Sequence, residues 1–138
     1  MADTLDIQTR LDIHELFARY VHLVDSNRAR DWVELFTPDG AFDIPGVFRL
    51  EGREQLLAMP ANVAELGGGK WRHQITNILA EPGERGDEIQ VRAYGLVSDW
   101  TEGGKLISFT DYRITLKRLD DQLLIHELVA NSPAPPPG

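Results

Sequence analysis

Apolar side chains near the N-terminus recur at helical spacing. Over residues 5–24 they follow three- and four-residue steps, which predicts an amphipathic helix with one broad buried face. Tyr20 lies on that face, and Asp25 continues the row of Phe17 and Val21 at four-residue steps. An acid is unfavourable there because the C-terminal end of a helix already carries negative partial charge. Asp25 is therefore either a polar residue turned to solvent or a buried carboxylate kept for function.

Shorter elements follow this helix. We expect a helix over 29–36, a hairpin over 41–44 and 47–50, and a helix over 53–66. Thr37-Pro38-Asp39-Gly40 predicts a turn after the first of these elements, because proline and glycine favour turns over helix continuation. Pro60 predicts a kink or two short helices within residues 53–66. The segment from Pro60 to Gly69 is expected to cover the mouth of a pocket.

From residue 70 onward the apolar period changes from helical spacing to two. Four strands are predicted, over 71–80, 88–100, 105–119 and 122–130. On the first strand, His73, Ile75, Asn77 and Leu79 are expected on one face, and Gly95 on the second strand predicts a bulge or bend. Tight turns between consecutive strands favour an antiparallel meander. Helices followed by such a sheet predict an α+β fold, with helices closing the concave side of a curved sheet around a pocket.

Composition excludes several function classes. With 138 residues, we expect one domain over residues 1–131 and a Pro-rich tail over 132–138. The net charge of -8 argues against binding to nucleic acid or to an anionic membrane. The absence of cysteine removes disulfides, thiol nucleophiles and cysteine metal ligands. Neither a signal peptide nor a membrane-spanning apolar stretch is evident, so we expect a cytoplasmic protein.

Four sequence motifs resemble one known group of proteins. They are Tyr20-Val21-His22-Leu23-Val24-Asp25, Trp32-Val33-Glu34-Leu35-Phe36-Thr37-Pro38-Asp39-Gly40, Gly52-Arg53-Glu54 and Arg72-His73-Gln74-Ile75-Thr76-Asn77. Together they resemble the SnoaL-like branch of the NTF2-like superfamily, over about residues 5–130. The resemblance implies a cone made of a strongly curved, mainly antiparallel sheet with N-terminal helices. Because this cone hosts dehydratases, isomerases, cyclases, hydrolases and non-catalytic modules, the fold alone does not determine the function.

Within this superfamily, the spacing is most similar to the group of bile acid 7α-dehydratase, scytalone dehydratase and lindane dehydrochlorinase. The resemblance implies that His73 is a general base, that Asp25 orients it and stabilises its charge, and that Tyr20 donates a hydrogen bond to a substrate or leaving oxygen. An elimination needs a base for a carbon-bound proton and an acid for the leaving group, and histidine titrates near neutral pH. We therefore expect a lyase of the dehydratase type that needs no cofactor. The alternative for His73 is a hydrogen-bonded core histidine.

Further residues are expected around the substrate, which we predict to be a small, apolar, cyclic and possibly polycyclic molecule. Asn77 shares a predicted face with His73, and Asp99 is a candidate polar wall residue. The other predicted wall residues are apolar or aromatic, and they are Trp71, Ile75, Phe109 and Tyr112. No His-x-His or His-Glu-x-x-His pattern is present, so no metal site is expected.

Other activities of the superfamily fit less well. An isomerase base of the ketosteroid type would be an acid directly before Pro45, but Ile44 stands there and Asp43 points to the opposite face of a strand. Scytalone dehydratase has a second histidine on the following strand, where Asp99 is the nearest residue in this chain. Its two-histidine arrangement is therefore not expected here. An epoxide-hydrolase set would need an Asp-Arg-Asp arrangement, and the charged residues of the later strands do not clearly converge. An isomerase or polyketide cyclase with the same His-Asp pair, and a non-catalytic binding or assembly module, remain the alternatives.

Both faces of the predicted sheet carry large apolar residues. They include Leu106, Ile114, Leu116, Ile125 and Val129. An apolar sheet face is seldom left to water. We therefore expect a homo-oligomer, a trimer or a dimer, in which the back of the sheet is buried between subunits.

Overall fold

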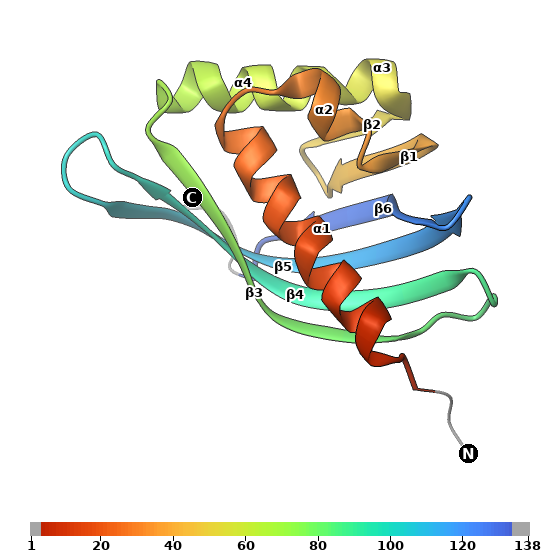
Figure 1. The fold of residues 1–138 in the computed structure, drawn as a ribbon. Helices are drawn as coiled ribbons and strands as arrows, with labels where there is room; N and C mark the ends of the chain where they lie inside the picture. Colours follow the sequence, from red (N-terminus) through yellow and green to blue (C-terminus); the bar gives the residue numbers. More distant parts are fainter. Residues whose placement is uncertain (1–3, 134–138) are drawn as a thin grey trace.

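The computed structural model describes residues 4–133, and its helices precede most of its strands (Figure 1). The elements in chain order are α1 (Ile7–Asp25), α2 (Ala29–Val33), β1 (Phe36–Ile44), β2 (Phe48–Glu51), α3 (Gly52–Leu56), α4 (Ala58–Gly67), β3 (Trp71–Pro82), β4 (Glu88–Asp99), β5 (Lys105–Leu119) and β6 (Gln122–Asn131). The strands form one six-stranded sheet in the order β2-β1-β6-β5-β4-β3. The β3–β6 meander is antiparallel, whereas β1 pairs with β6 in parallel. The predicted α+β fold is confirmed.

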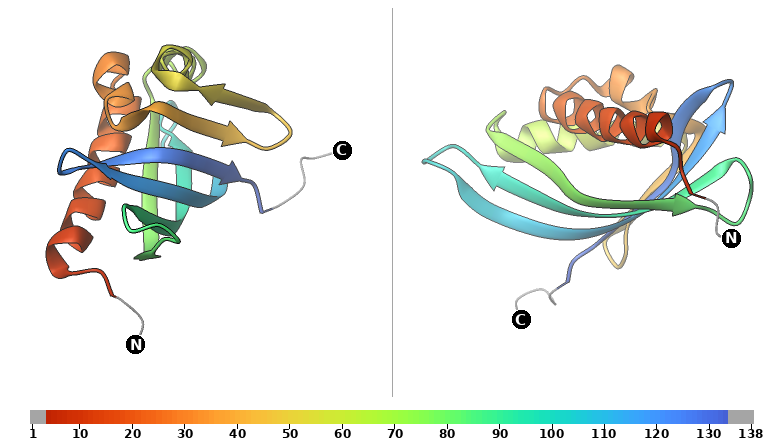
Figure 2. Two further views of the ribbon diagram at one scale, coloured as in Figure 1. Left: turned by 90° about the vertical axis from the view of Figure 1, so that its right-hand side faces the viewer. Right: turned by 60° about the horizontal axis from the view of Figure 1, so that its bottom comes forward.

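The sheet curves strongly, and α1 crosses its concave side while the other helices close one end (Figures 1 and 2). The side chain of Asp6 caps α1 by accepting a hydrogen bond from the backbone N–H of Thr9 at 2.8 Å. The buried residues of α1 repeat at helical spacing, and they are Thr9, Ile13, Leu16, Phe17, Tyr20 and Val24. The amphipathic helix predicted from the sequence is therefore confirmed, and it ends at Asp25.

The turn predicted at residues 37–40 is wrong, because β1 already begins at Phe36. The parallel pairing of β1 with β6 is irregular between Phe36 and Ala41, so the missing N–H of Pro38 falls where the ladder is interrupted. At Gly40, an added Cβ would lie only 3.1 Å from the backbone oxygen of Ile125. This close approach of two backbones favours glycine at a position where the sequence pattern predicted a turn.

The segment around Pro60 forms two short helices, as predicted. Helix α3 ends at Leu56 and α4 begins at Ala58, so the break precedes Pro60. Pro60 lies buried in the first turn of α4, where a missing backbone N–H costs no helical hydrogen bond. The helix ends next to Gly68, which has a φ of 56° and adopts the left-handed conformation typical of a helix C-terminus.

The alternation predicted for β3 holds only as far as Ile75. Asn77 has a φ of 55°, and the pairing of β3 with β4 shifts between Thr76 and Leu79. This bulge changes which residues face inward, so Ile78 is half-buried and Leu79 is 70% exposed. The prediction that Asn77 and Leu79 share the face of His73 is therefore wrong.

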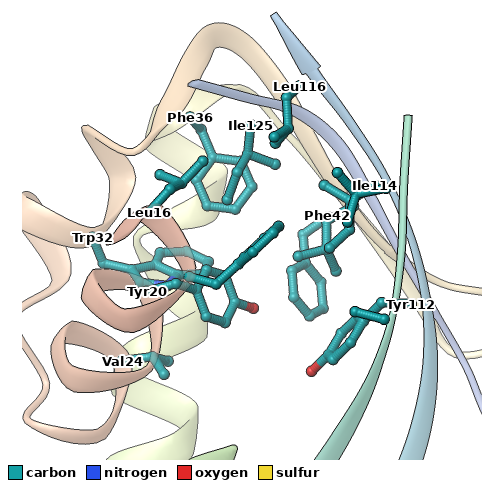
Figure 3. Packing of buried hydrophobic residues seen from close by; sticks show 14 of the residues in the cluster. Leu16, Tyr20, Val24, Trp32, Phe36, Phe42, Tyr112, Ile114, Leu116 and Ile125 are labelled. Atoms are coloured by element: carbon teal, nitrogen blue, oxygen red, sulfur yellow. The ribbon is translucent and has the colours of Figure 1, made fainter. Parts of the chain in front are cut away.

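The core lies between α1 and the concave face of the sheet (Figure 3). Aromatic rings fill the end near α2, where Trp32 has its ring centroid 4.8 Å from that of Phe36 and 6.4 Å from that of Phe42. Farther along the sheet, Ile114 and Leu116 are completely buried. Polar side chains that project into this space therefore meet an apolar environment.

Candidate functional site

Asp25 and His73 meet where the end of α1 lies against the start of β3. Oδ1 of Asp25 lies 2.6 Å from Nδ1 of His73. Oδ2 of the same carboxylate accepts a hydrogen bond from the backbone N–H of His73 at 2.9 Å. Both carboxylate oxygens are thus used by one residue, and the structure brings together two of the three residues predicted to be catalytic.

This contact determines which nitrogen of the imidazole is available. A carboxylate only accepts hydrogen bonds, so Nδ1 of His73 must carry the proton that is shared with Asp25. Nε2 is then unprotonated in the neutral ring and can accept a proton. Both side chains are 10% exposed, so the pair is largely shielded from water. The geometry is that of a base held in one tautomer and one orientation by a carboxylate.

Tyr20 lies on the same helix as Asp25, with its ring inside the aromatic cluster. Its ring centroid lies 5.5 Å from that of Trp32 and 6.5 Å from that of Phe36. Burial raises the pKa of Tyr20 well above its ordinary value, and the nearby Tyr112 and Asp25 raise it further. The hydroxyl therefore stays protonated at any physiological pH and can donate a hydrogen bond.

A cavity of about 780 Å³ borders the pair. Its walls come from the C-terminal part of α1, from α4, from the segments that follow these two helices, and from β3, and they include Asp25, Asn27, Ala64, Gly69 and His73. Helix α4 lies close to β3 at Gly67. A Cβ added to this glycine would come within 2.4 Å of Cγ of Trp71. The segment from Pro60 to Gly69, which was predicted to cover the pocket mouth, thus lies beside this cavity. The absence of a side chain at Gly67 lets the Trp71 indole pack against α4.

Three of the predicted wall residues lie on the face of His73 or at its edge. Trp71 and Ile75 alternate with His73 along β3, and all three are half-buried. Asp99 pairs with Trp71 across the strands. Its carboxylate accepts a hydrogen bond from the backbone N–H of Thr101 at 2.9 Å, which is the main cause of its lowered pKa. Asp99 therefore caps the turn after β4 at the rim of the sheet.

Two of the remaining predicted residues, Asn77 and Phe109, do not lie at the pair. Asn77 is exposed at the bulge of β3. Phe109 lies opposite Leu96 on the convex face, and its ring centroid is 5.4 Å from that of Tyr94. The bulge explains the first error, and the second arises because both faces of β5 carry aromatic residues.

Comparisons with known proteins agree with this architecture. A family model described as a SnoaL-like domain matches residues 6–129. The chain belongs to the SnoaL-like family. No curated protein sequence matches this SnoaL-like chain.

Solved structures similar to this SnoaL-like protein come from several bacteria. Rv3472 from Mycobacterium tuberculosis, a protein of unknown function, is 27% identical, with a TM-score of 0.82 over 93% of this chain and 73% of its own. Aln2 from a Streptomyces species is 20% identical, with a TM-score of 0.84 over 94% of both chains. A candidate scytalone dehydratase from Novosphingobium aromaticivorans is 19% identical, with a TM-score of 0.76 over 93% of this chain and 85% of its own. The last two likenesses show the NTF2-like fold alone.

Two side chains in the core of this SnoaL-like protein were not predicted to have a polar role. Tyr112 was expected only as a core or wall aromatic, yet its hydroxyl lies near enough to Asp25 for that residue to raise its pKa. Trp32 is completely buried, and its Nε1–H has no hydrogen-bond partner among residues 4–133. In the sequence, only Gly95 indicated where the ring of Tyr112 lies. That indication could not be interpreted without knowing how the residues of β4 and β5 pair.

Within residues 4–133, no group of three or more His, Asp or Glu side chains is arranged to hold a metal ion. No helix in this part of the SnoaL-like chain is both long and apolar enough to cross a membrane.

Proposed function

We propose that this SnoaL-like protein is a cofactor-independent lyase that eliminates water from a small, apolar, cyclic substrate. The observation that carries the proposal is the contact of Asp25 with both the ring and the backbone of His73. A surface histidine would not need such a fixed orientation, and a purely structural one would more often use both ring nitrogens. Among the described residues, none is hydrogen-bonded to Nε2 of His73.

The elimination starts with proton transfer to His73. Nε2 takes a proton from a substrate carbon, and the electron pair of that C–H bond forms the new carbon–carbon double bond. The hydroxyl group on the neighbouring carbon leaves with its bonding pair and receives the proton back from Nε2, so one water is released and His73 is neutral again. The charge of the transient imidazolium is stabilised by Asp25.

Tyr20 and the surrounding side chains complete the proposed site. The protonated Tyr20 hydroxyl donates a hydrogen bond to a substrate oxygen, in a region from which water is largely excluded. Trp71 and Ile75 supply apolar surface beside His73, which suits a cyclic hydrocarbon skeleton. The candidate scytalone dehydratase among the similar structures is consistent with this chemistry.

A panel of cyclic alcohols, with and without a carbonyl group β to the hydroxyl, tests the proposal. Loss of one water is followed by mass spectrometry, and exchange of substrate C–H protons is followed in deuterated water. His73→Ala should lower both rates by a factor of about 100 or more, and Asp25→Asn should lower them in the same direction. His14→Ala, which removes an exposed histidine from α1, is the matched control.

The same assay separates the alternatives. A product of unchanged mass that depends on His73 would indicate an isomerase or a cyclase with the same base. Binding of panel members without exchange or turnover, unaltered by His73→Ala, would contradict the lyase and support a binding module. Thermal unfolding of each variant checks that lost activity does not reflect a lost fold.

A further inference from the structure

Two arginine side chains lie directly opposite each other on the convex face of the sheet. Arg92 on β4 pairs with Arg113 on β5, and the two strands are neighbours in the sheet (Figure 1). The pairing is regular around them, without the bulge predicted at Gly95. Because the adjacent Ala93 and Ile114 are buried in the core, both arginines point outward, and both are exposed. Like charges in directly opposite positions destabilise a pair of antiparallel strands.

Neither guanidinium group has a counter-charge from its own chain. Within the described range of 4–133, Arg92 and Arg113 form no ion pair and no side-chain hydrogen bond. Acids are not scarce, because the chain has 22 Asp and Glu against 14 Lys and Arg. Acids of this face are grouped around Arg49 instead, which contacts the carboxylates of Glu51 at 2.8 Å and Glu127 at 3.0 Å. The N–H donors of both guanidinium groups are therefore available to a bound anion.

The two arginines border a hollow of about 840 Å³ on the convex face. Uncharged polar side chains also line it, and they are Asn77, Tyr94 and Asn131. Among the described residues, Asp111 is the one carboxylate in this lining, and it forms no ion pair with either arginine. The nearest acid of β3, Glu81, lies outside the lining. The hollow therefore has a surplus of positive charge in a protein whose net charge is -8.

Apolar side chains flank the arginine pair across the sheet. Leu79 on β3 pairs with Arg92, and Val129 on β6 pairs with Arg113. Two residues along β4, the ring of Tyr94 is exposed beside them. A guanidinium group binds carboxylates and phosphates through parallel N–H donors, so it suits an anion with at least two oxygens. A ligand that reaches both groups would also contact the apolar surface around them.

We propose that Arg92 and Arg113 form a binding site for an oxyanion carried on an apolar ring, such as an aromatic carboxylate or an aromatic phosphate ester. The oxyanion lies between the two guanidinium groups and offsets their repulsion with charge-assisted hydrogen bonds. The ring lies against Tyr94 and Leu79. This hollow shares no lining residue with the cavity beside His73, so the site does not depend on the proposed function.

The site is compatible with an oligomer that buries the apolar end of the convex face. Phe109 is four residues from Arg113 along β5, or about 13 Å at the rise of a strand. Leu106 lies farther toward the turn between β4 and β5, so exposed apolar side chains gather at that end. A neighbouring subunit that covers this end would leave the arginine pair at the rim of the contact. A carboxylate of a second copy is the other anion that could reach the pair, and the experiment separates the two.

Benzoate and phenyl phosphate are the probes for this site. Benzamide, which has the same ring without a charge, is the matched control ligand. The amide resonances of ¹⁵N-labelled protein are followed during titration at low ionic strength. We expect the two anions to shift the resonances of residues 92–94 and 111–113, and benzamide to leave them in place. The tighter binder of the two anions identifies the class of oxyanion.

Substitutions at the hollow provide the second measurement. Arg92→Gln and Arg113→Gln should each weaken binding of the anions by about tenfold or more, because hydrogen bonds to a charged oxygen are lost. Asp111→Asn should strengthen binding, because a repelling charge is removed. Arg30→Gln, which changes an exposed arginine on α2, should leave the affinity unchanged. All four positions lie outside the buried core, so the variants should keep their fold, and thermal unfolding checks this.

Several results would overturn the inference. They are equal affinities for benzoate and benzamide, wild-type affinity in both glutamine variants of the arginine pair, and shifts confined to residues 73–75. If neither anion binds and Arg113→Gln lowers the particle mass in light scattering, the arginines pair with carboxylates of a second copy instead. His73→Ala should bind the anions as the wild-type protein does, so a failure of this site leaves the proposed lyase untouched.

Discussion

Ionisation of Tyr112 should destabilise the folded protein at alkaline pH. Burial and the nearby Asp25 raise the pKa of this hydroxyl from its ordinary value of 10.0 to about 12. Between these two values the unfolded chain loses the phenolic proton while the folded chain keeps it. The unfolded state therefore binds fewer protons, and the free energy of unfolding falls as the pH rises. The stability is intact below the unfolded pKa and is lost as the pH rises through the folded pKa.

The size of this loss of stability follows from the shift in the pKa of Tyr112. Each pKa unit corresponds to about 1.4 kcal/mol, so Tyr112 should cost the folded state about 3 kcal/mol once both states are ionised. Tyr20 acts in the same direction, because its pKa is also raised. Such a loss is a substantial fraction of the stability of an ordinary domain.

Urea unfolding of the wild-type protein and Tyr112→Phe, from about pH 8 to about pH 12, measures this loss. The variant cannot ionise at position 112, so its free energy of unfolding should fall less steeply, with the gap from wild type changing by about 2 kcal/mol by pH 12, where the folded Tyr112 is half ionised. Tyr94→Phe is the control because Tyr94 is 46% exposed. Parallel pH profiles for wild type and Tyr112→Phe would refute the reasoning, since the Tyr112 hydroxyl would then be hydrated in the folded protein.

Three other changes have predictable results. Gly95→Ala should destabilise the protein by about 1–3 kcal/mol in urea unfolding, because the new methyl group overlaps the ring of Tyr112; unchanged stability would show that the ring moves freely. Asp6→Ala should lower the melting temperature by removing the cap on the Thr9 N–H, and the difference should vanish as the pH falls through the lowered pKa of Asp6. If the convex face is buried between subunits, Phe109→Glu should convert an oligomer into a smaller species in light scattering, whereas a wild-type monomer would contradict that expectation.

The helices and the meander could be predicted because their patterns are local. Helix α1 keeps one apolar face over 19 residues, which is long enough for its period to dominate. Strand β1 could not be predicted over Phe36 to Gly40, because Pro38 favours a turn locally and pairing with the distant β6 decides the outcome. The local preference for a turn was overridden by pairing with β6, which a local sequence pattern cannot show.

A single residue accounts for the error in the part of the site lining that was predicted from β3. Asn77 adopts a left-handed conformation that asparagine tolerates better than most residues, and the resulting bulge turns Leu79 out to solvent. Strict alternation had placed both side chains beside His73. The positions of Tyr112 and Gly95 were hidden for a related reason, since their contact depends on the register between β4 and β5.

The acid at the end of α1 illustrates how stability and chemistry are linked in this fold. Its position is unfavourable twice, because the helix terminus is already negative and the surroundings are largely apolar. The structure offsets both costs with two N–H donors from one residue, the backbone and the ring of His73. Those donors anchor α1 to the edge strand β3 and also fix the imidazole with Nε2 free. The alternative of a solvent-facing Asp25 is therefore excluded, and the interaction that makes the buried acid tolerable is the same one that would hold the base in position for catalysis.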